Sequence, residues 1–437
     1  MNVVKVGGSS LQDVSHFEQL AERLRREHPP PSLVVISALP GVTRRLEQAA
    51  LLAQHGDLGA ATLILQQILA QHIACVNALF GGTALAQALV KLIDEIGERT
   101  ERLLRGVALT GVLTPRTLDR IVSTGERFVL HIVRHLLLER GLEAHAIAAD
   151  ELIVTDEQFG NACPLVDETA ARVQQRLIPA LEQGGYVITE GFVGATANGD
   201  VTTMGKESSS LTAALLASLV GARHLVFYTP VAGIFSADPL LVPTARPISQ
   251  LSYDHAEHLA YAGLKLLYPT MIAPLRVHNT VLRVTALDAH SQQSTEITHT
   301  RNGHDVFVVM EEHLMLVQLD RSAFTQATEC LWRYREVVAI EYGTVLVLAE
   351  PPHVLSLEQL GIVVRNSTPC RLLRVWGWSS SADFHTKLQQ CVAALPQRRA
   401  MVVVQNGEES LLSAVTLSVA PQLLASLHDA IVENLVR

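Results

Sequence analysis

Short apolar segments rich in β-branched residues alternate along this chain with longer segments of helical periodicity, and this alternation restricts the possible folds more than any other feature. Several of the short segments are apolar throughout, which is typical of strands covered by helices on both faces. Alternation of this kind predicts a mostly parallel, layered α/β domain. The strand candidates are Val3–Val6, Leu33–Ser37, Tyr186–Glu190, Leu225–Thr229 and Val281–Thr285. The helix candidates are 15–27, 43–54, 58–80, 83–105, 116–140, 167–183 and 208–220.

The pattern changes near the end of the last of these strands. Residues 287–304 are polar and lack apolar periodicity, which predicts a linker. Residues 305–437 contain a strand–helix–strand pattern roughly twice, which predicts two small α+β units. We therefore expect one domain over 1–290 and tandem small units over 305–437. The strands expected there are Val306–Met310, Leu314–Gln318, Thr344–Leu348, Arg371–Trp376 and Ala400–Gln405, with helices near 323–334, 381–394 and 420–436.

Composition narrows the class of function. Apolar residues make up 48% of the 437 residues and the net charge is −9, which argues against nucleic acid as a partner. Since no apolar run approaches 18 residues, no membrane span is expected. The first residues lack the charged and apolar regions of a signal peptide. Five scattered cysteines without a CxxC pair predict neither a disulfide framework nor a zinc cluster, so we expect a cytoplasmic protein.

The first segment that could carry chemistry follows the first strand. Val3–Val6 runs directly into Gly7-Gly8-Ser9-Ser10, and a helix is expected soon after. Glycines let backbone N–H groups approach an anion closely, and the ammonium of Lys5 could meet a transferring phosphoryl group. The segment is not a Walker A loop, because no Gly-Lys-Ser/Thr follows. The alternative is an ordinary turn between a strand and a helix.

Three later segments have similar character. Residues 202–212 place small hydroxyl residues, including Ser209, at the start of an apolar helix, which suits an anion site or simply a well-capped helix. Residues 227–239 form a strand end followed by a turn-rich loop, where open α/β sheets usually bind ligands. In residues 263–269 Lys265 stands between apolar residues, where it could face a ligand or only increase solubility.

Together these segments resemble the amino acid kinase family, and within it the aspartate kinases. The resemblance covers nearly the whole chain, and the motifs occur in the family's order. It implies a mostly parallel three-layer α/β kinase domain followed by paired ACT units. The motifs that carry it are Lys5–Ser10, Val35–Ala38 with Gly41–Thr43, Ser123–Glu126, Thr155–Gly160, Gly191–Gly194, Ser236–Pro239 and Gly263–Pro269.

The resemblance implies a reaction and a role for each site residue. The reaction is transfer of the ATP γ-phosphoryl group, with Mg²⁺, to the side-chain carboxylate of L-aspartate, the first step towards lysine, threonine and methionine. Such chemistry needs positive charge and N–H donors around the transferred group. The implied roles are catalysis for Lys5, phosphate or nucleotide binding for Gly7, Gly8, Ser9, Ser209, Tyr228, Thr229, Asp238 and Lys265, and substrate binding for Ser37, Glu126 and Asn161.

Two departures from the family pattern concern the substrate pocket. Asn161 stands where the family has an arginine that clamps the aspartate α-carboxylate, and Leu165 replaces an aspartate. A charge-assisted pair becomes at best a neutral hydrogen bond, which removes ~2–3 kcal/mol of binding. The alternatives to an aspartate kinase are therefore a kinase for another small carboxylate and a catalytically weak amino-acid sensor on the same scaffold.

The resemblance also implies properties of the tail. ACT units in this family bind regulatory amino acids and associate, so we expect an amino-acid effector and a homodimer. The family's Gly-Phe-Leu-Ala stretch after the first ACT strand is replaced here by Asp320-Arg321-Ser322-Ala323-Phe324, so control by lysine or threonine is not expected. No resident metal site is expected either.

Overall fold

The fold is described from a computed structural model of the chain, which divides into two compact units. Unit 1 comprises Met1–Gly233, Ser249–Glu257 and Leu266–Thr300, and unit 2 comprises Ile234–Ile248, His258–Lys265 and Arg301–Arg437. The structure describes residues 1–205, 208–261, 264, 266–288, 293–300, 306–320, 334–341, 344–349, 364–377, 401–406, 410–416, 424–426 and 428–429.

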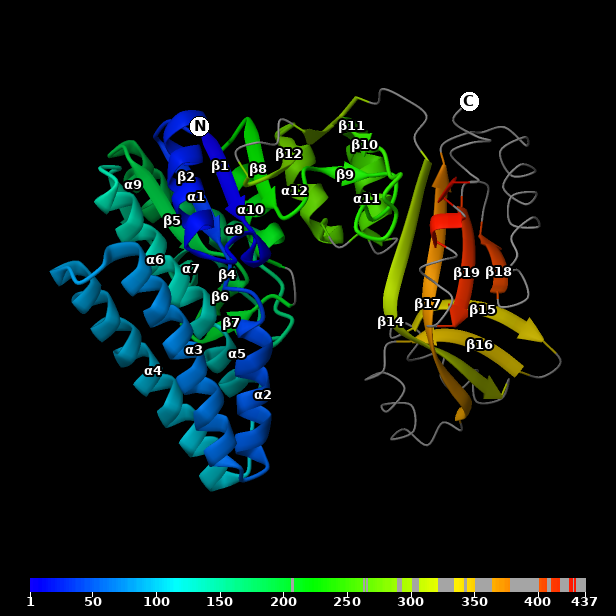
Figure 1. Cartoon of the computed structure of the whole chain (residues 1–437), viewed down its shortest axis with the longest axis horizontal. Helices are drawn as coiled ribbons and strands as arrows, with labels where there is room; N and C mark the ends of the chain where they lie inside the picture. The colour runs from blue at the N-terminus through cyan, green and yellow to red at the C-terminus, as the bar shows by residue number, and fades with distance from the viewer. Residues whose placement is uncertain are drawn as a thin grey trace. The chain divides into compact units, whose positions relative to one another are not determined.

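The centre of unit 1 is an eight-stranded sheet with the order β11-β13-β12-β8-β1-β2-β5-β3 (Figure 1). All neighbouring strands in it are parallel except β12 and β13. The predicted mostly parallel sheet is thereby confirmed. Its strands are β1 (Asn2–Val6), β2 (Ser32–Ile36), β3 (Ala144–Ala146), β5 (Tyr186–Glu190), β8 (His224–Thr229), β11 (Gln250–Ser252), β12 (Val281–Ala286) and β13 (Ser294–Thr298).

Strand β13 corrects one prediction. It lies inside residues 287–304, which the sequence pattern indicated as a linker, and it pairs antiparallel with β12 and parallel with β11. Only Thr295 and Ile297 of this strand are buried, and one of them is polar. The alternation is therefore too short and too polar to be recognised in the sequence. Pairing with its neighbours makes this segment a strand.

Helices cover both faces of the sheet. Val4 and Val6 of β1 share one hydrophobic core with Leu20 and Leu24 of the helix α1 (Val14–Glu27) and Phe128 of the helix α6 (Thr124–Glu139). The helix α10 (Ser209–Leu219) contacts β1, β2 and β8, and its buried residues lie outside that core cluster. Because successive side chains of a strand point to opposite faces, Lys5 lies on the other face of the sheet from Val4 and Val6, the face covered by α10.

The predicted helices of unit 1 are present, with two differences at their ends, whereas α7 (Ala149–Leu152), α11 (Tyr253–Tyr261) and α12 (Ile272–Val277) were not among the helix candidates. The predicted helix 83–105 extends to Thr110, and the predicted helix 116–140 is broken at Ser123. The helical elements are α1 (Val14–Glu27), α2 (Val42–Gln54), α3 (Leu58–Phe80), α4 (Ala84–Thr110), α5 (Pro115–Val122), α6 (Thr124–Glu139), α7 (Ala149–Leu152), α8 (Val166–Arg172), α9 (Ile178–Glu182), α10 (Ser209–Leu219), α11 (Tyr253–Tyr261), α12 (Ile272–Val277), η1 (Gly8–Ser10), η2 (Val173–Leu177) and η3 (Pro269–Met271). A small sheet of β4 (Val154–Thr155), β6 (Val193–Thr196) and β7 (Val201–Thr203) lies in the same unit.

The helix α3 corrects the expectation about apolar runs. By length and composition alone it could cross a membrane, with a mean hydropathy of 1.5 over its most apolar window. This is weak evidence, because core helices of soluble proteins meet the same criterion. Its buried residues, from Ala61 through Leu65, Ile68 and His72 to Val76, recur at helical spacing and belong to the face that packs on α2 and α4.

Unit 2 contains a six-stranded antiparallel sheet with the order β15-β16-β14-β17-β19-β18. The strands predicted at Val306–Met310 and Leu314–Gln318 are one continuous strand, β14, and β15 and β19 were not predicted. Most of the helices expected in the tail lie outside the described residues, apart from helical residues at 424–426 and 428–429. The strands are β9 (Ile234–Phe235), β10 (Pro247–Ile248), β14 (Val306–Asp320), β15 (Tyr334–Glu341), β16 (Thr344–Ala349), β17 (Val364–Gly377), β18 (Met401–Asn406) and β19 (Ser410–Thr416).

Candidate active site

Most of the predicted site residues of unit 1 lie at one edge of its large sheet. Strands β1, β2, β5 and β8 are parallel neighbours, so their carboxyl ends meet at this edge. The Gly7 N–H donates to the Tyr228 carbonyl at 3.2 Å, which ties the end of β1 to the end of β8. The Gly191 N–H donates to the Ile36 carbonyl at 2.7 Å, which ties the end of β5 to the end of β2. Ligands of open α/β sheets bind at such an edge.

Lys5 and the two glycines lie together at the end of β1. The Lys5 ammonium is 5.2 Å from the centroid of the Phe227 ring on β8. A Cβ on Gly7 would stand 3.4 Å from that ammonium, so the lysine side chain lies beside the glycine backbone. A Cβ on Gly8 would stand only 2.1 Å from the Ala38 carbonyl oxygen. A glycine at this position therefore allows the segment after β1 to approach the segment after β2.

The residues around this turn contribute mostly through the backbone. The Tyr228 carbonyl accepts the Ser10 hydroxyl at 3.0 Å in addition to its bond from Gly7. The Tyr228 side chain is fully buried and its hydroxyl lies 2.8 Å from His28 Nε2. Burial raises the pKa of the Tyr228 phenol. Tyr228 therefore reaches this edge with its carbonyl, whereas Ser9 is exposed and the Thr229 hydroxyl donates to the Val231 carbonyl at 2.7 Å.

The helix α10 begins beside the end of β5. A Cβ on Gly191 would stand 2.5 Å from the Cβ of Ser209, so the absence of a side chain at Gly191 lets the helix start come close. The Phe192 N–H donates to the Thr212 hydroxyl at 3.1 Å, and Phe192 has a φ of 70°. The N-terminus of a helix carries partial positive charge and favours anions. Ser209 therefore places an anion-favouring helix end near this edge.

Glu126 on α6 is a buried carboxylate at the end of β2. Its side chain is 3% exposed, and its Oε1 accepts the Ala38 N–H at 3.3 Å. Its Oε2 has no hydrogen-bond partner among the described residues. Burial raises the pKa of Glu126 from 4.5 to about 8, the Ala38 N–H and the Thr43 hydroxyl oppose this, and the charge of Glu190 adds to it. Ser37 directly precedes Ala38 and is half-buried, so it lies beside this carboxylate.

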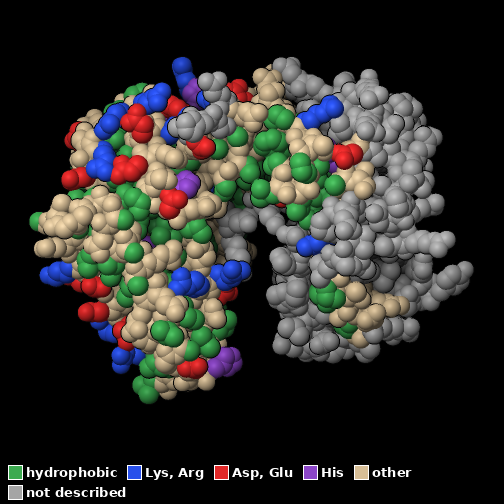
Figure 2. Space-filling view, viewed as in Figure 1, with side chains coloured by type: hydrophobic (Ala, Val, Ile, Leu, Met, Phe, Trp, Pro, Cys, Tyr) green, Lys and Arg blue, Asp and Glu red, His purple; other side chains and the backbone are tan. Residues whose placement is uncertain are grey.

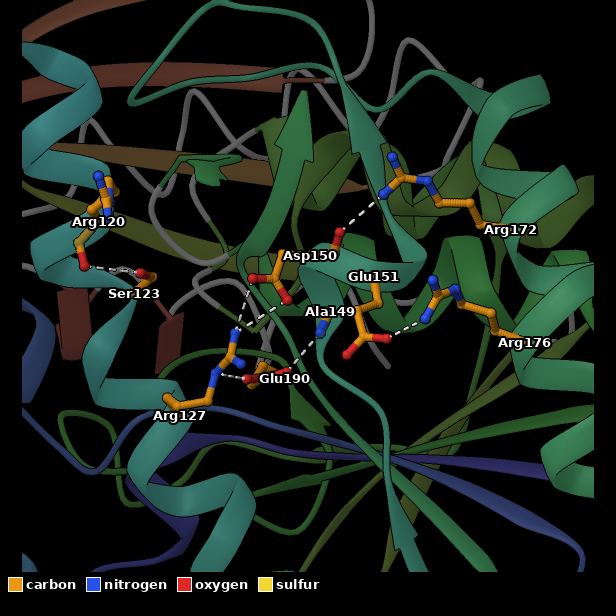
Figure 3. Close-up of polar contacts among 9 residues, drawn as sticks. All are labelled: Arg120, Ser123, Arg127, Ala149, Asp150, Glu151, Arg172, Arg176 and Glu190. Carbon is orange, nitrogen blue, oxygen red and sulfur yellow. Dashed lines mark hydrogen bonds and ion pairs between the residues drawn. The ribbon is translucent and has the colours of Figure 1, made fainter. Parts of the chain in front are cut away.

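A second buried carboxylate near Glu126 is compensated (Figure 3). Arg127 Nε lies 2.6 Å from Glu190 Oε1, and its Nη2 lies 3.2 Å from both carboxylate oxygens of Asp150. The Ala149 N–H donates to Glu190 Oε2 at 2.7 Å. Burial raises the pKa of Glu190, against the attraction of Arg127. Sequence reasoning missed Arg127 and Glu190, although a carboxylate that ends a buried apolar strand is a recognisable signal.

The loop that carries Asn161 is held by Asp119, which the sequence pattern did not select as a site residue. Asp119 is 1% exposed and its Oδ2 accepts the N–H groups of Gly160 and Thr203, both at 2.9 Å. Its Oδ1 accepts the Thr203 hydroxyl at 2.7 Å. A Cβ on Gly205, which has a φ of +87°, would stand 2.7 Å from Asn161 Oδ1. Asn161 therefore lies beside the segment that leads into α10.

Two predicted residues are not placed at this edge. Asp238 belongs to unit 2, where its Oδ1 accepts the Leu240 N–H at 2.9 Å. Lys265 lies outside the described residues. The residues that unit 1 places at or beside the edge are Lys5, Gly7, Gly8, Ser9, Ser37, Glu126, Ser209, Thr229 and, through its carbonyl, Tyr228. Asn161 lies beside the segment that leads into α10.

Among curated proteins, the chain matches aspartokinases over part of their length. It is 29% identical over 272 residues to lysine-sensitive aspartokinase 3 of Escherichia coli (strain K12), covering 62% of this chain and 58% of that protein. It is 30% identical over 305 residues to chloroplastic aspartokinase 3 of Arabidopsis thaliana, covering 69% of this chain and 53% of that protein. The chain thus spans little more than half the length of these two relatives.

Solved structures show the same fold. The crystal structure of E. coli aspartokinase III in complex with aspartate and ADP matches with a TM-score of 0.82 and 21% identity, covering 99% of each chain. The same enzyme in complex with lysine and aspartate matches with a TM-score of 0.74 and 22% identity, covering 98% of this chain and 99% of that one. A model of the amino acid kinase family matches residues 1–286, well over half of the sequence. This chain therefore belongs to the amino acid kinase family.

Proposed function

We propose that the protein is an aspartate kinase that transfers the γ-phosphoryl group of Mg-ATP to the side-chain carboxylate of L-aspartate. The relatives named above are aspartokinases, and the solved structure of one of them contains aspartate and ADP. The observation that carries the proposal is Glu126, whose buried Oε2 lacks a hydrogen-bond partner among the described residues. The substrate ammonium would pair with this oxygen.

The phosphoryl group would be transferred at the end of β1. Lys5 would neutralise charge that develops on the transferred group, because its ammonium lies beside the Gly7 backbone. Gly7, Gly8 and Ser9 would lie along the phosphates, and Ser209 would add the positive end of α10. The Mg²⁺ would arrive bound to the nucleotide phosphates and neutralise part of their charge. The protein's contribution is mainly positioning and electrostatic stabilisation.

A kinase for another small carboxylate is the second candidate, and Asn161 is the observation that favours it. Its side chain lies beside Gly205, where it offers an amide in place of the arginine that clamps the substrate carboxylate in the family. A neutral amide forms a weaker hydrogen bond to a carboxylate than a guanidinium does. A catalytically weak amino-acid sensor is the third candidate.

The proposal extends to the whole chain. Residues 1–290 would carry catalysis, and residues 305–437 would form tandem ACT-like units that bind an amino-acid effector. The protein would act in the cytoplasm as a homodimer in amino-acid biosynthesis. Thr229 and the carbonyl of Tyr228 would line the nucleotide side. The antiparallel sheet of unit 2 supports the α+β character of the tail.

A coupled assay of ADP formation tests the proposal. Purified protein is supplied with Mg-ATP and, in turn, aspartate, glutamate and related small acids, and Lys5→Ala is expected to lose turnover. Lys91→Ala is the matched control, because the Lys91 side chain is exposed on α4 and its ammonium makes only a long ion pair, 4.0 Å from Glu95 Oε1. Turnover with an acid other than aspartate supports the second candidate. Nucleotide binding without turnover of any acid supports the sensor, and unchanged turnover in Lys5→Ala contradicts the proposal.

A further inference from the structure

A cavity of about 260 Å³ opens between the helices α4, α5 and α6 of unit 1. Its lining includes Arg99 and Thr100 of α4, Arg120 of α5, and Arg127 of α6, with Ser123 between the last two helices. Glu126 does not line it, so the cavity is separate from the carboxylate of the candidate active site. Three arginines thus come from three different helices to one small space.

The charges of this cavity are unbalanced. Arg127 is compensated by Asp150 and Glu190 (Figure 3), whereas neither Arg99 nor Arg120 has an acidic partner among the residues the structure describes. The one acidic residue of the lining is Glu95, which lies 4.0 Å from Lys91. On the face shown in Figure 2, basic and acidic side chains are interspersed over unit 1. The lining of the cavity differs from this surface, because its arginines outnumber its carboxylates.

The histidine of the lining does not supply the missing negative charge. Burial lowers the pKa of His131 to about 4, and the charge of Arg127 adds to this effect. The imidazole is therefore neutral at physiological pH, and it leaves the positive charge of the arginines in the lining unchanged. An anion that entered the cavity would be attracted by the guanidinium groups.

The other lining groups define the kind of anion. Ser123 donates its hydroxyl to the Arg120 carbonyl at 3.2 Å, and its oxygen can still accept. The hydroxyls of Thr100 and Thr124 lie 3.1 Å apart. Leu92, Ile96 and Leu103 form an apolar part of the wall. The volume is below the ~300–1,000 Å³ of pockets that hold drug-sized ligands, so the ligand must be small.

We propose that this cavity is a binding site for a small organic oxyanion, a carboxylate or a phosphate monoester with a short apolar part. Arg99 and Arg120 would bind the oxyanion through their paired N–H donors, which match carboxylate and phosphate oxygens in geometry. The leucine and isoleucine side chains would pack on the apolar part. The site does not depend on the proposed kinase activity.

Isothermal titration calorimetry of the full chain with inorganic phosphate, acetate and 3-methylbutanoate tests this site. At least one probe is expected to bind, and Arg99→Gln and Arg120→Gln are each expected to weaken its binding about tenfold or more. Arg102→Gln is the matched control, because Arg102 is exposed on α4 and does not line the cavity. Tighter binding of 3-methylbutanoate than of acetate supports the apolar wall, and preference for phosphate identifies the phosphate group as the source of the oxyanion.

A second measurement separates this site from the candidate active site. Binding of the probe in the presence of saturating ATP, and in Lys5→Ala, is expected to equal that of the unmodified protein. A probe that ATP displaces has bound at the sheet edge and overturns the assignment. The proposal is equally wrong if no probe binds, or if the two arginine variants bind the probe as tightly as the Arg102→Gln control does.

Discussion

The role proposed for Glu126 predicts that substrate affinity depends on pH. The Glu126 pKa of about 8 means that the free protein carries this carboxyl mostly protonated at neutral pH. An ammonium group that pairs with Oε2 favours the ionised form, so binding selects the minor, ionised state. The apparent dissociation constant is the intrinsic one divided by the ionised fraction, which is about 1% at pH 6 and about 50% at pH 8. Aspartate should therefore bind about 50-fold more tightly at pH 8 than at pH 6.

Calorimetry across this pH range is the direct assay. At pH 7 about nine in ten Glu126 side chains are protonated before binding, so binding should release close to one proton. Titrations in buffers of different ionisation enthalpy measure this proton directly. Succinate, which lacks the ammonium, serves as the matched ligand: its affinity should not rise with pH.

The variant Glu126→Gln isolates the group. The amide keeps an oxygen for the Ala38 N–H and nearly the same volume, so the fold should be retained. Its aspartate affinity should be low and independent of pH between 6 and 8. If the unmodified protein binds aspartate equally well at both pH values, or if the variant keeps the full pH dependence, Glu126 does not bind the substrate ammonium.

Three further predictions follow from the site. Gly8→Ala places a Cβ 2.1 Å from the Ala38 carbonyl oxygen and should lower the free energy of unfolding by about 1–3 kcal/mol. Gly106→Ala is the control: Gly106 lies in α4 with open space around it, so this change should raise the free energy of unfolding by about 1 kcal/mol. Denaturant titration measures both. Asp119→Asn should cost about 1.5–3 kcal/mol of stability and raise the KM for the acid more than that for ATP, and equal changes in both KM values would contradict its positioning role. Asn161→Arg combined with Leu165→Asp should lower the KM for aspartate, and an unchanged value would refute the interpretation of the two departures.

The sequence was sufficient to predict five of the eight strands of the large sheet, because these strands are apolar and long enough to recognise. Strands β1, β2, β5, β8 and β12 lie where the pattern indicated, within one or two residues. Strands β3 and β11 were missed because each has only three residues, and strand β13 was missed because only one of its two buried residues is apolar. Strands β15 and β19 lie in segments whose apolar alternation was not recognised, and their pairing with β16, β17 and β18 is a contact between distant parts of the chain.

The residues of the candidate site likewise fall into those that local sequence patterns indicated and those that they did not. Lys5 and the glycines were selected because a glycine pair after a strand is a local signal. Asp119 and Arg127 were not, because what each does depends on partners far away in the sequence. Asp119 binds Thr203 across 84 positions, and Arg127 pairs with a carboxylate at the end of β5. Short-range patterns cannot show such contacts, although they can place the residues on a helix.

The two buried carboxylates near the start of α6 differ in how far the protein compensates their charge. Glu190 receives Arg127 and the Ala149 N–H, so its charge is compensated within the protein. Glu126 has no cationic partner among the described residues, and its pKa rises from 4.5 in the unfolded chain to about 8 in the folded one. Between these values the folded state holds more protons than the unfolded state, so stability falls as pH rises, by about 5 kcal/mol in total. A bound ammonium would offset this cost, because it supplies the charge that the fold gives to Glu190 but not to Glu126.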